Sequence, residues 1–191
     1  MRKRLVLFMS LLMLCLMTAT ALAADVNKVE KERGEIQELS AKALRGLYEE
    51  VPAAKGVIEN SYAYATLSNT GIKLGLFGDA HGRGLAVNNA TGEKVYMRMK
   101  EMGLGLGLGV KEYDLIFVIA TEEAWKSFIS GDIKFASSAE ASASDGVTGD
   151  SMAGASVAGK GIWVYQITKK GLALEASIKG TKIYPYKKLN Q

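Results

Sequence analysis

The side chains best suited to acid/base chemistry lie close together in a glycine-rich stretch. His81 is the only histidine, and Asp79 precedes it by two residues. On an extended segment both side chains would project to the same side, as a general acid/base pair requires. The flanking glycines predict a loop, and no Gly-x-Ser-x-Gly turn supplies a nucleophile. We therefore interpret His81 as a loop residue, with a Ser-His-Asp arrangement as the alternative.

Metal and cofactor chemistry find little support in the sequence. Cys15 is the only cysteine and lies in the apolar N-terminal run, so cysteine–histidine zinc sites and a disulfide scaffold are excluded. The run at residues 103–109 alternates glycine with leucine, and it lacks the glycine spacing of a dinucleotide-binding loop. Alternation predicts a strand whose glycine face lets another element approach closely. We expect no metal, no cofactor and no enzymatic activity.

The C-terminal region carries the clearest charge signal. Residues 169–188 contain six lysines and a single acid, Glu175. Lys182, Tyr184, Tyr186 and Lys188 alternate along an extended tail, and Pro185 confines that tail to the edge of a sheet. Lysines beside tyrosines suit a membrane–water interface, whereas a solvated edge protected by lysines is the alternative. The candidate lipid-binding residues are Lys169, Lys170, Lys179, Lys182, Tyr184, Tyr186, Lys187 and Lys188.

The first residues are typical of a secretory signal. Three basic residues at positions 2–4 precede an apolar run at 5–17, and Ala21-Leu-Ala23 offers a cleavage site. The run is shorter than the roughly 20 residues that span a membrane, although a retained anchor is the alternative. We expect cleavage after Ala23, export to the periplasm or medium, and one domain at 24–191. Loss of the leader lowers the net charge from +4 to +1, because it removes three basic residues and no acid.

The remaining pattern predicts an α+β domain. A helix is expected at 26–50 from its apolar stripe, which either packs on the core or contacts a membrane, with a second helix at 53–60. Residues 62–67, 72–77, 84–88 and 94–100 predict short strands, with a turn at 89–92. Residues 114–120 predict a strand buried on both faces, and Thr121 and Gly131 bound a helix. Strands are expected at 162–167 and 172–178.

The fold class is therefore a helix pair and one internal helix packed on a largely antiparallel sheet. Residues 136–161 consist of small side chains and are expected to form strands with a turn at 159–161, the alternative being a linker. The expected core includes Leu39, Leu47, Ile116, Val118, Trp125, Phe128, Trp163 and Leu174.

Several of these segments, in this order, resemble the SYLF domain, also called the Ysc84 domain. The resemblance extends from about residue 41 to residue 183, and residues 62–68 depart from the usual family pattern. It implies lipid binding, with phosphoinositides as ligands of eukaryotic members and actin as a partner in the yeast branch. The matching segments are Ala43-Leu-Arg-Gly-Leu-Tyr, Pro52-Ala-Ala-Lys, residues 71–84, the glycine strand, Asp114-Leu-Ile-Phe-Val, Ala124-Trp-Lys-Ser-Phe and residues 174–183.

The expected function is thus non-catalytic binding of anionic phospholipid at a membrane surface by an exported protein. The alternative is a protein–protein or structural component of the cell envelope that does not contact lipid. An export signal argues against both nucleic acid and actin as partners.

Overall fold

The structure is a computed structural model that describes residues 2–133, 152–169, 171–173 and 181–191. The chain forms two compact units, Met1–Glu35 and Ile36–Gln191. Helix α1 (Arg2–Glu50) contributes to both, and in the first unit its Arg33 and Glu30 side chains form an ion pair at 2.7 Å. Within the described part of the chain, no helix combines the length and apolar character needed to cross a membrane.

The predicted helices are present. Helix α1 ends at Glu50 as expected, and α2 (Ala54–Asn60) begins one residue later than predicted. Helix α3 (Glu122–Ser130) has both expected end signals: the Thr121 hydroxyl accepts a hydrogen bond from the Ala124 backbone N–H, and Gly131 is left-handed with φ 83°. A non-glycine residue would be strained at that C-terminal position.

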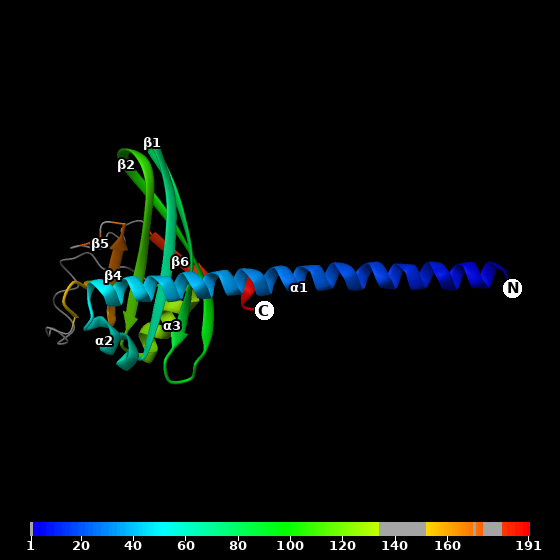
Figure 1. The fold of residues 1–191 in the computed structure, drawn as a ribbon, viewed down its shortest axis with the longest axis horizontal. Coiled ribbons are helices and arrows are strands. Elements are labelled where there is room, and N and C mark those ends of the chain that lie inside the picture. Colours follow the sequence, from blue (N-terminus) through cyan, green and yellow to red (C-terminus); the bar gives the residue numbers. More distant parts are fainter. Residues whose placement is uncertain (1, 134–151, 170, 174–180) are drawn as a thin grey trace. The chain divides into compact units, whose positions relative to one another are not determined.

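The described strands form one antiparallel sheet in the order β1-β2-β4-β3. The short strand β5 pairs with β4, while β6 pairs with β2. Figure 1 shows β1 and β2 running next to each other and bending over together. The strand bounds are β1 (Ala63–Asn88), β2 (Lys94–Ile119), β3 (Ser156–Gly159), β4 (Ile162–Thr168), β5 (Gly171–Leu172) and β6 (Thr181–Pro185).

The prediction of several separate short strands before residue 120 was wrong. They merge into β1 and β2, each 26 residues long, which pair as one hairpin around the predicted 89–92 turn. Glycine and asparagine were taken as strand ends, yet continuous pairing with a partner strand overrides such local signals. For the same reason His81 is not in a loop: it lies in β1, opposite Lys100.

The long hairpin doubles back, so that the two ends of β1 meet. The Asn89 backbone N–H donates a 3.1 Å hydrogen bond to the Tyr62 carbonyl oxygen. At the closest approach, a Cβ on Gly84 would overlap the Thr66 carbonyl oxygen. Glycine is therefore required at position 84 because another backbone segment occupies the space of a side chain.

Two hydrophobic clusters lie on the two faces of the strands near residues 115–119. The inner cluster joins Phe117 of β2 to Phe128 of α3, whose ring centroids are 5.2 Å apart. The outer cluster packs Leu47 of α1 against Val118 and Trp163. As predicted, this part of β2 is buried on both faces.

The core predictions mostly hold, with one correction. Leu39 is only half-buried and lines an open groove beside the sheet. Leu174 and residues 136–151 lie outside the described residues, whereas β3 and the turn at 160–161 confirm strands at the end of the small-residue stretch. The remaining predicted core residues are buried: Leu47, Ile116, Val118, Trp125, Phe128 and Trp163.

Candidate functional site

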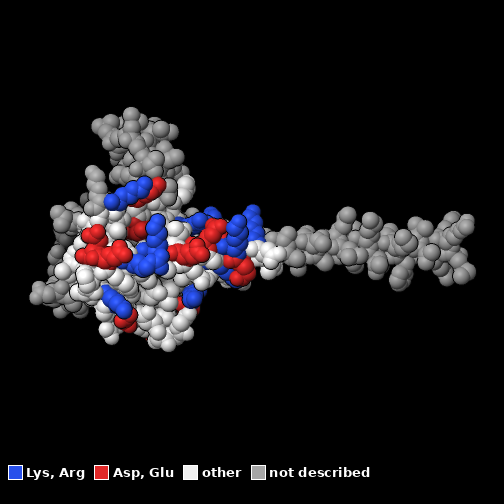
Figure 2. Space-filling view, in the orientation of Figure 1, with Lys and Arg blue, Asp and Glu red and all other residues white. Residues whose placement is uncertain are grey.

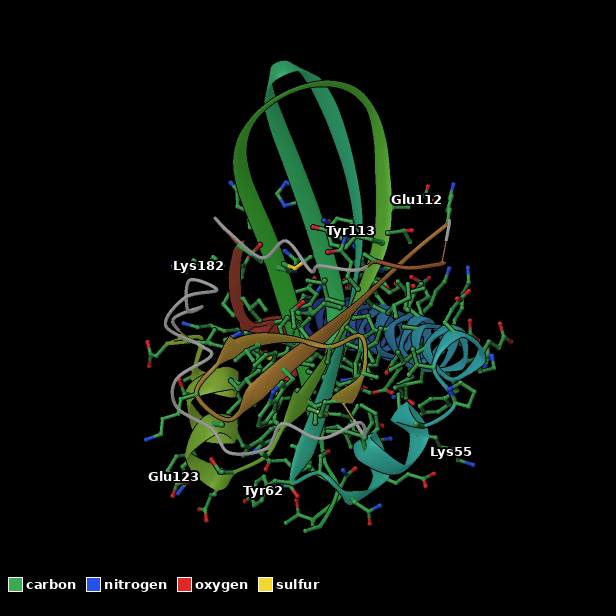
Figure 3. The ribbon with its side chains drawn as sticks, turned by 90° about the vertical axis from the view of Figure 1, so that its left-hand side faces the viewer. Lys55, Tyr62, Glu112, Tyr113, Glu123 and Lys182 are labelled. Carbon is green, nitrogen blue, oxygen red and sulfur yellow. The ribbon has the colours of Figure 1, made fainter. Side chains whose placement is uncertain are left out.

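The predicted lipid-binding residues do not all share one surface. Lys169 follows β4, and its Nζ lies 2.8 Å from a carboxylate oxygen of Glu112. Strand β4 pairs with β2 from Tyr113 onward, whereas β6 pairs with β2 only up to Glu101. In Figure 3, accordingly, Lys182 lies on the left of the view and Glu112 on the right.

The other predicted residues fall into two groups. Lys182 and Tyr184 lie in β6, and Tyr186 follows it directly. Lys187 is exposed and Lys188 half-buried in a 3-10 helix, η2 (Lys187–Leu189), so the prediction of a tail that stays extended through residue 188 was wrong. Lys170 and Lys179 lie outside the described residues.

Strand β6 is an edge strand with one covered face. It pairs with β2 alone among the described strands, and Pro185 at its end agrees with the predicted edge position. Ile183 is fully buried in the inner cluster beside Met99, its partner on β2. Because side chains alternate along a strand, Lys182 and Tyr184 project from the opposite face.

Two registered rows of side chains run across that opposite face. In the first, His81 of β1 lies opposite Lys100 of β2, which lies opposite Lys182 of β6. In the second, Arg83 lies opposite Arg98, which lies opposite Tyr184. Directly opposed residues in antiparallel strands project to the same side, with Cβ atoms roughly 5 Å apart. We call His81, Arg83, Arg98, Lys100 and Lys182 the cationic face.

Tyr186 extends this surface, and several contacts fix its position. The Arg98 guanidinium carbon lies 3.7 Å from the centre of the Tyr186 ring, a cation–π contact. The Tyr186 backbone N–H donates to the Tyr96 carbonyl oxygen at 2.8 Å. The side-chain amide of Asn190 then bonds both the backbone N–H and the carbonyl of Tyr96, at 2.8 and 2.9 Å. The last residues are therefore clamped to β2.

The positive charge of the cationic face arises because strand pairing brings basic residues together, and not because the chain as a whole is strongly basic. Figure 2 shows acidic and basic side chains interspersed on the face that it displays. The two registered rows, in contrast, contain no acidic residue. Directly opposed like charges destabilise a sheet, although His81, Arg83 and Lys100 each have an interaction partner within the chain.

Sequence reasoning missed four members of the cationic face: His81, Arg83, Arg98 and Lys100. They lie more than 80 residues before Lys182 and become its neighbours only through strand pairing. The one local signal was alternation, since histidine and arginine at 81 and 83, and arginine and lysine at 98 and 100, are each two residues apart. That spacing places both members of each pair on one face of a strand.

Two hollows elsewhere are less suited to an anionic ligand. A groove of about 410 Å³ between α1 and the sheet has walls of both signs, including Lys42 and Arg45 but also Glu49 and Asp114. A second, of about 500 Å³, adjoins the start of α3 and includes Glu123. Hydrogen bonds from its own backbone N–H and the Thr121 hydroxyl lower the pKa of Glu123. A lowered pKa makes this carboxylate a poor general base near neutral pH.

Metal-binding groups do not converge in the described residues. No group of three or more histidine, cysteine, aspartate or glutamate side chains there could hold a metal ion. Burial raises the pKa of the phenols of Tyr48, Tyr64 and Tyr165, which keeps them protonated. The cationic face is thus the best-defined candidate site.

Comparison with known proteins identifies the family. Residues 100–191 match the family described as Ysc84, Las17-binding protein actin regulator. Over 167 residues the chain is 32% identical to the beta cell expansion factor A of Aeromonas veronii, an alignment that covers 86% of this chain and 61% of that protein. The chain belongs to the SYLF (Ysc84) domain family. It spans about three fifths of the length of that relative.

Proposed function

We propose that this chain is a non-catalytic protein that binds anionic phospholipid through the cationic face. The observation that carries the proposal is the pair of registered rows, which places Arg83, Arg98 and Lys182 on one side of three adjacent strands. Lipid binding is known for SYLF domains in general, and a cationic surface extends it to anionic head groups.

Binding would combine electrostatic attraction of basic residues to the membrane with partial burial of tyrosine side chains among the head groups. Each lysine or arginine near an anionic membrane contributes about 1 kcal/mol, and salt weakens the attraction over the Debye length. Tyr184 and Tyr186, both half-buried, would lie at head-group depth, where tyrosine is favoured. Lys187 of η2 is exposed next to Tyr186 and would add to the same contact.

The proposal includes location and partners. The charged start, apolar run and small-residue site at 1–23 support cleavage after Ala23 and export, with the protein peripheral on an envelope membrane or secreted. An exported protein would not meet cytoplasmic actin or nucleic acid, and the function needs no cofactor.

The test is vesicle co-sedimentation of the processed protein with phosphatidylcholine vesicles, with and without phosphatidylglycerol. Changing Lys182, Lys187 and Lys188 together to Gln should weaken binding to the anionic vesicles by about two decades, at about 1 kcal/mol per lysine. The matched control changes three exposed lysines elsewhere, Lys55, Lys126 and Lys160.

The control variant should keep near wild-type affinity, and binding of the wild type should fall as salt rises. Melting curves on the same preparations establish that each variant is folded. Unchanged affinity of the first variant would refute the proposed surface. No binding by the wild type would favour the alternative of an envelope component that contacts other proteins.

A further inference from the structure

The groove of about 410 Å³ between α1 and the sheet is bounded on one side by a single face of the helix. Leu39, Lys42 and Arg45 follow one another at intervals of three residues, so their side chains are neighbours along that face. Lys42 and Arg45 are both exposed. At Gly46 the helix runs close to the sheet, since a Cβ there would lie 3.8 Å from a methyl carbon of Ile167. This wall therefore presents two cationic side chains beside an apolar one.

The floor of the groove carries a carboxylate beside a hydroxyl group. Ser68 of β1 lies opposite Asp114 of β2, which lies opposite Ile167 of β4, so the three side chains project from one side of the sheet. That side faces α1, because Ile116, two residues further along β2, packs in the outer cluster with residues of that helix. Asp114 is half-buried and takes part in none of the ion pairs formed among the described residues. Its charge is therefore left for a ligand in the groove.

The remaining charged residues of the groove are exposed. The Lys169 Nζ and a Glu112 carboxylate oxygen form an ion pair at 2.8 Å, so these two charges compensate each other. Glu49 of α1 is exposed to solvent, where salt screens its charge. The two basic residues of the helical wall belong to no ion pair in the described part of the chain. The groove thus offers a ligand two cations on its wall and a carboxylate on its floor.

This set of groups favours a ligand that carries both charges. An anion would be repelled by Asp114, and a cation would be repelled by Lys42 and Arg45. A guanidinium donates two parallel hydrogen bonds to a carboxylate, whereas a primary ammonium has three N–H donors for a carboxylate and a hydroxyl oxygen. An α-amino acid carries a carboxylate and an ammonium on one carbon atom. Its side chain would find apolar contacts at Leu39 and Ile167.

We propose that this groove binds a free α-amino acid with an apolar side chain. Lys42 and Arg45 bind its carboxylate, while Asp114 and Ser68 accept hydrogen bonds from its ammonium group. The volume of the groove falls within the range of small-molecule sites, roughly 300–1,000 Å³. The site goes beyond the proposed function and does not depend on it, because the groove lies where β4 pairs with β2 and the cationic face lies where β6 does.

The test is an NMR titration of the isotope-labelled processed protein with leucine at constant ionic strength, followed at the amide signals of Gly46, Ser68 and Asp114. Two matched compounds each lack one charge: N-acetylleucine has no ammonium group, and leucinamide has no carboxylate. Leucine should bind at least about tenfold more tightly than either compound, the effect of one charged hydrogen-bonded group. Unshifted signals at millimolar leucine, or equal binding of the three compounds, would overturn the proposal.

Two variants test the two ends of the ligand separately. Asp114→Asn should abolish the preference for leucine over N-acetylleucine and keep the preference over leucinamide. Lys42→Gln with Arg45→Gln should have the reverse effect, because it removes the partners of the carboxylate. The matched control, Asp132→Asn, changes an exposed acid outside the groove and should keep both preferences. A variant of the groove that keeps both preferences would overturn the role assigned to its residues.

The amide spectra also show whether each variant is folded. Should Asp114→Asn fail to fold, the double change on the exposed wall of the helix still decides the proposal. The change of Lys182, Lys187 and Lys188 to Gln, which weakens the cationic face, should leave leucine binding unaltered. Leucine binding without vesicle binding would therefore overturn the proposed function alone, and vesicle binding without leucine binding would overturn the groove site alone.

Discussion

The two halves of strand β2 are neighbours in one chain but have opposite surroundings. Residues 115–119 are covered on one face by α3 and on the other by α1 and α2. In residues 97–100, Met97 and Met99 are buried on the inner face, while Arg98 is exposed and Lys100 half-buried on the other face. One half therefore stabilises the fold, and the other presents charge on a rigid support.

The comparison teaches where function can be placed in a sheet. A strand buried on both faces tolerates no charge, because an unpaired buried ion is costly. A strand with one covered face anchors itself through alternate residues and leaves the others available for binding. The cationic face uses this second arrangement on β1, β2 and β6 together.

We expect the largest effect on the free energy of unfolding at Gly84, where the two ends of β1 approach each other. Gly84→Ala would place a methyl group on the Thr66 carbonyl oxygen, so the backbone must move. We expect a loss of more than about 4 kcal/mol of unfolding free energy, measured by urea denaturation. Gly56→Ala, in open space on α2, should be neutral or slightly stabilising. A mild effect at position 84 would show that the two ends of β1 do not touch.

The half of β2 that is covered on both faces should be sensitive to loss of side-chain volume. Phe117→Ala removes a fully buried ring in contact with Phe128 and should cost about 3–5 kcal/mol. Val87→Ala, at a half-buried position on the other half of the hairpin, should cost less than about 1 kcal/mol. Denaturation midpoints would test the difference, and equal losses would contradict the contrast between the halves.

Two exposed lysines should respond with opposite signs. Lys182→Gln relieves repulsion from the opposed Lys100 and should raise the unfolding free energy by about 0.2–0.5 kcal/mol. Lys126→Gln breaks a 2.6 Å ion pair with Glu122 and should lower the unfolding free energy. Precise thermal melts at low salt would measure both. A destabilising Lys182→Gln would show that the cationic face has no stability cost.

The smallest expected effect is on the pH dependence of stability at helix α3, which covers the inner face of both halves of β2. The lowered pKa of Glu123 means that its ionised form is stabilised on folding. That contribution is present above the unfolded value of 4.5 and is lost as pH falls through the folded value. Glu123→Gln should therefore lower the melting temperature at pH 7 and make no difference near pH 2. A pH-independent difference would contradict this.

The elements that sequence predicted best were those with local signals. Thr121 and Gly131 mark the ends of α3, and the apolar run in 114–120 marks a strand covered twice. Gly84 misled the prediction because glycine usually interrupts a strand, whereas here it admits a neighbouring backbone. Such a role depends on residues far away in the chain, and no local pattern encodes it.

The residues of the candidate site likewise divide into those with a local sequence signal and those that depend on distant residues. Lys182 and Tyr184 were found from lysine density and alternation, both local properties. Arg83 and Arg98 needed the register of the hairpin, which the sequence alone did not reveal. Conversely, Lys169 is close to Lys182 in sequence, but it pairs with Glu112 elsewhere because β4 and β6 join different parts of β2.

The central claim is that the cationic face, and not the region around Lys169, contacts the membrane. The direct test labels single cysteines with a polarity-sensitive fluorophore in the processed protein, residues 24–191, which lacks Cys15, the only native cysteine. Vesicles containing phosphatidylglycerol should shift the emission of a label at Tyr184→Cys to the blue and leave labels at Lys169→Cys and Lys55→Cys unchanged. A blue shift at position 169 or 55 with none at 184 would contradict the account.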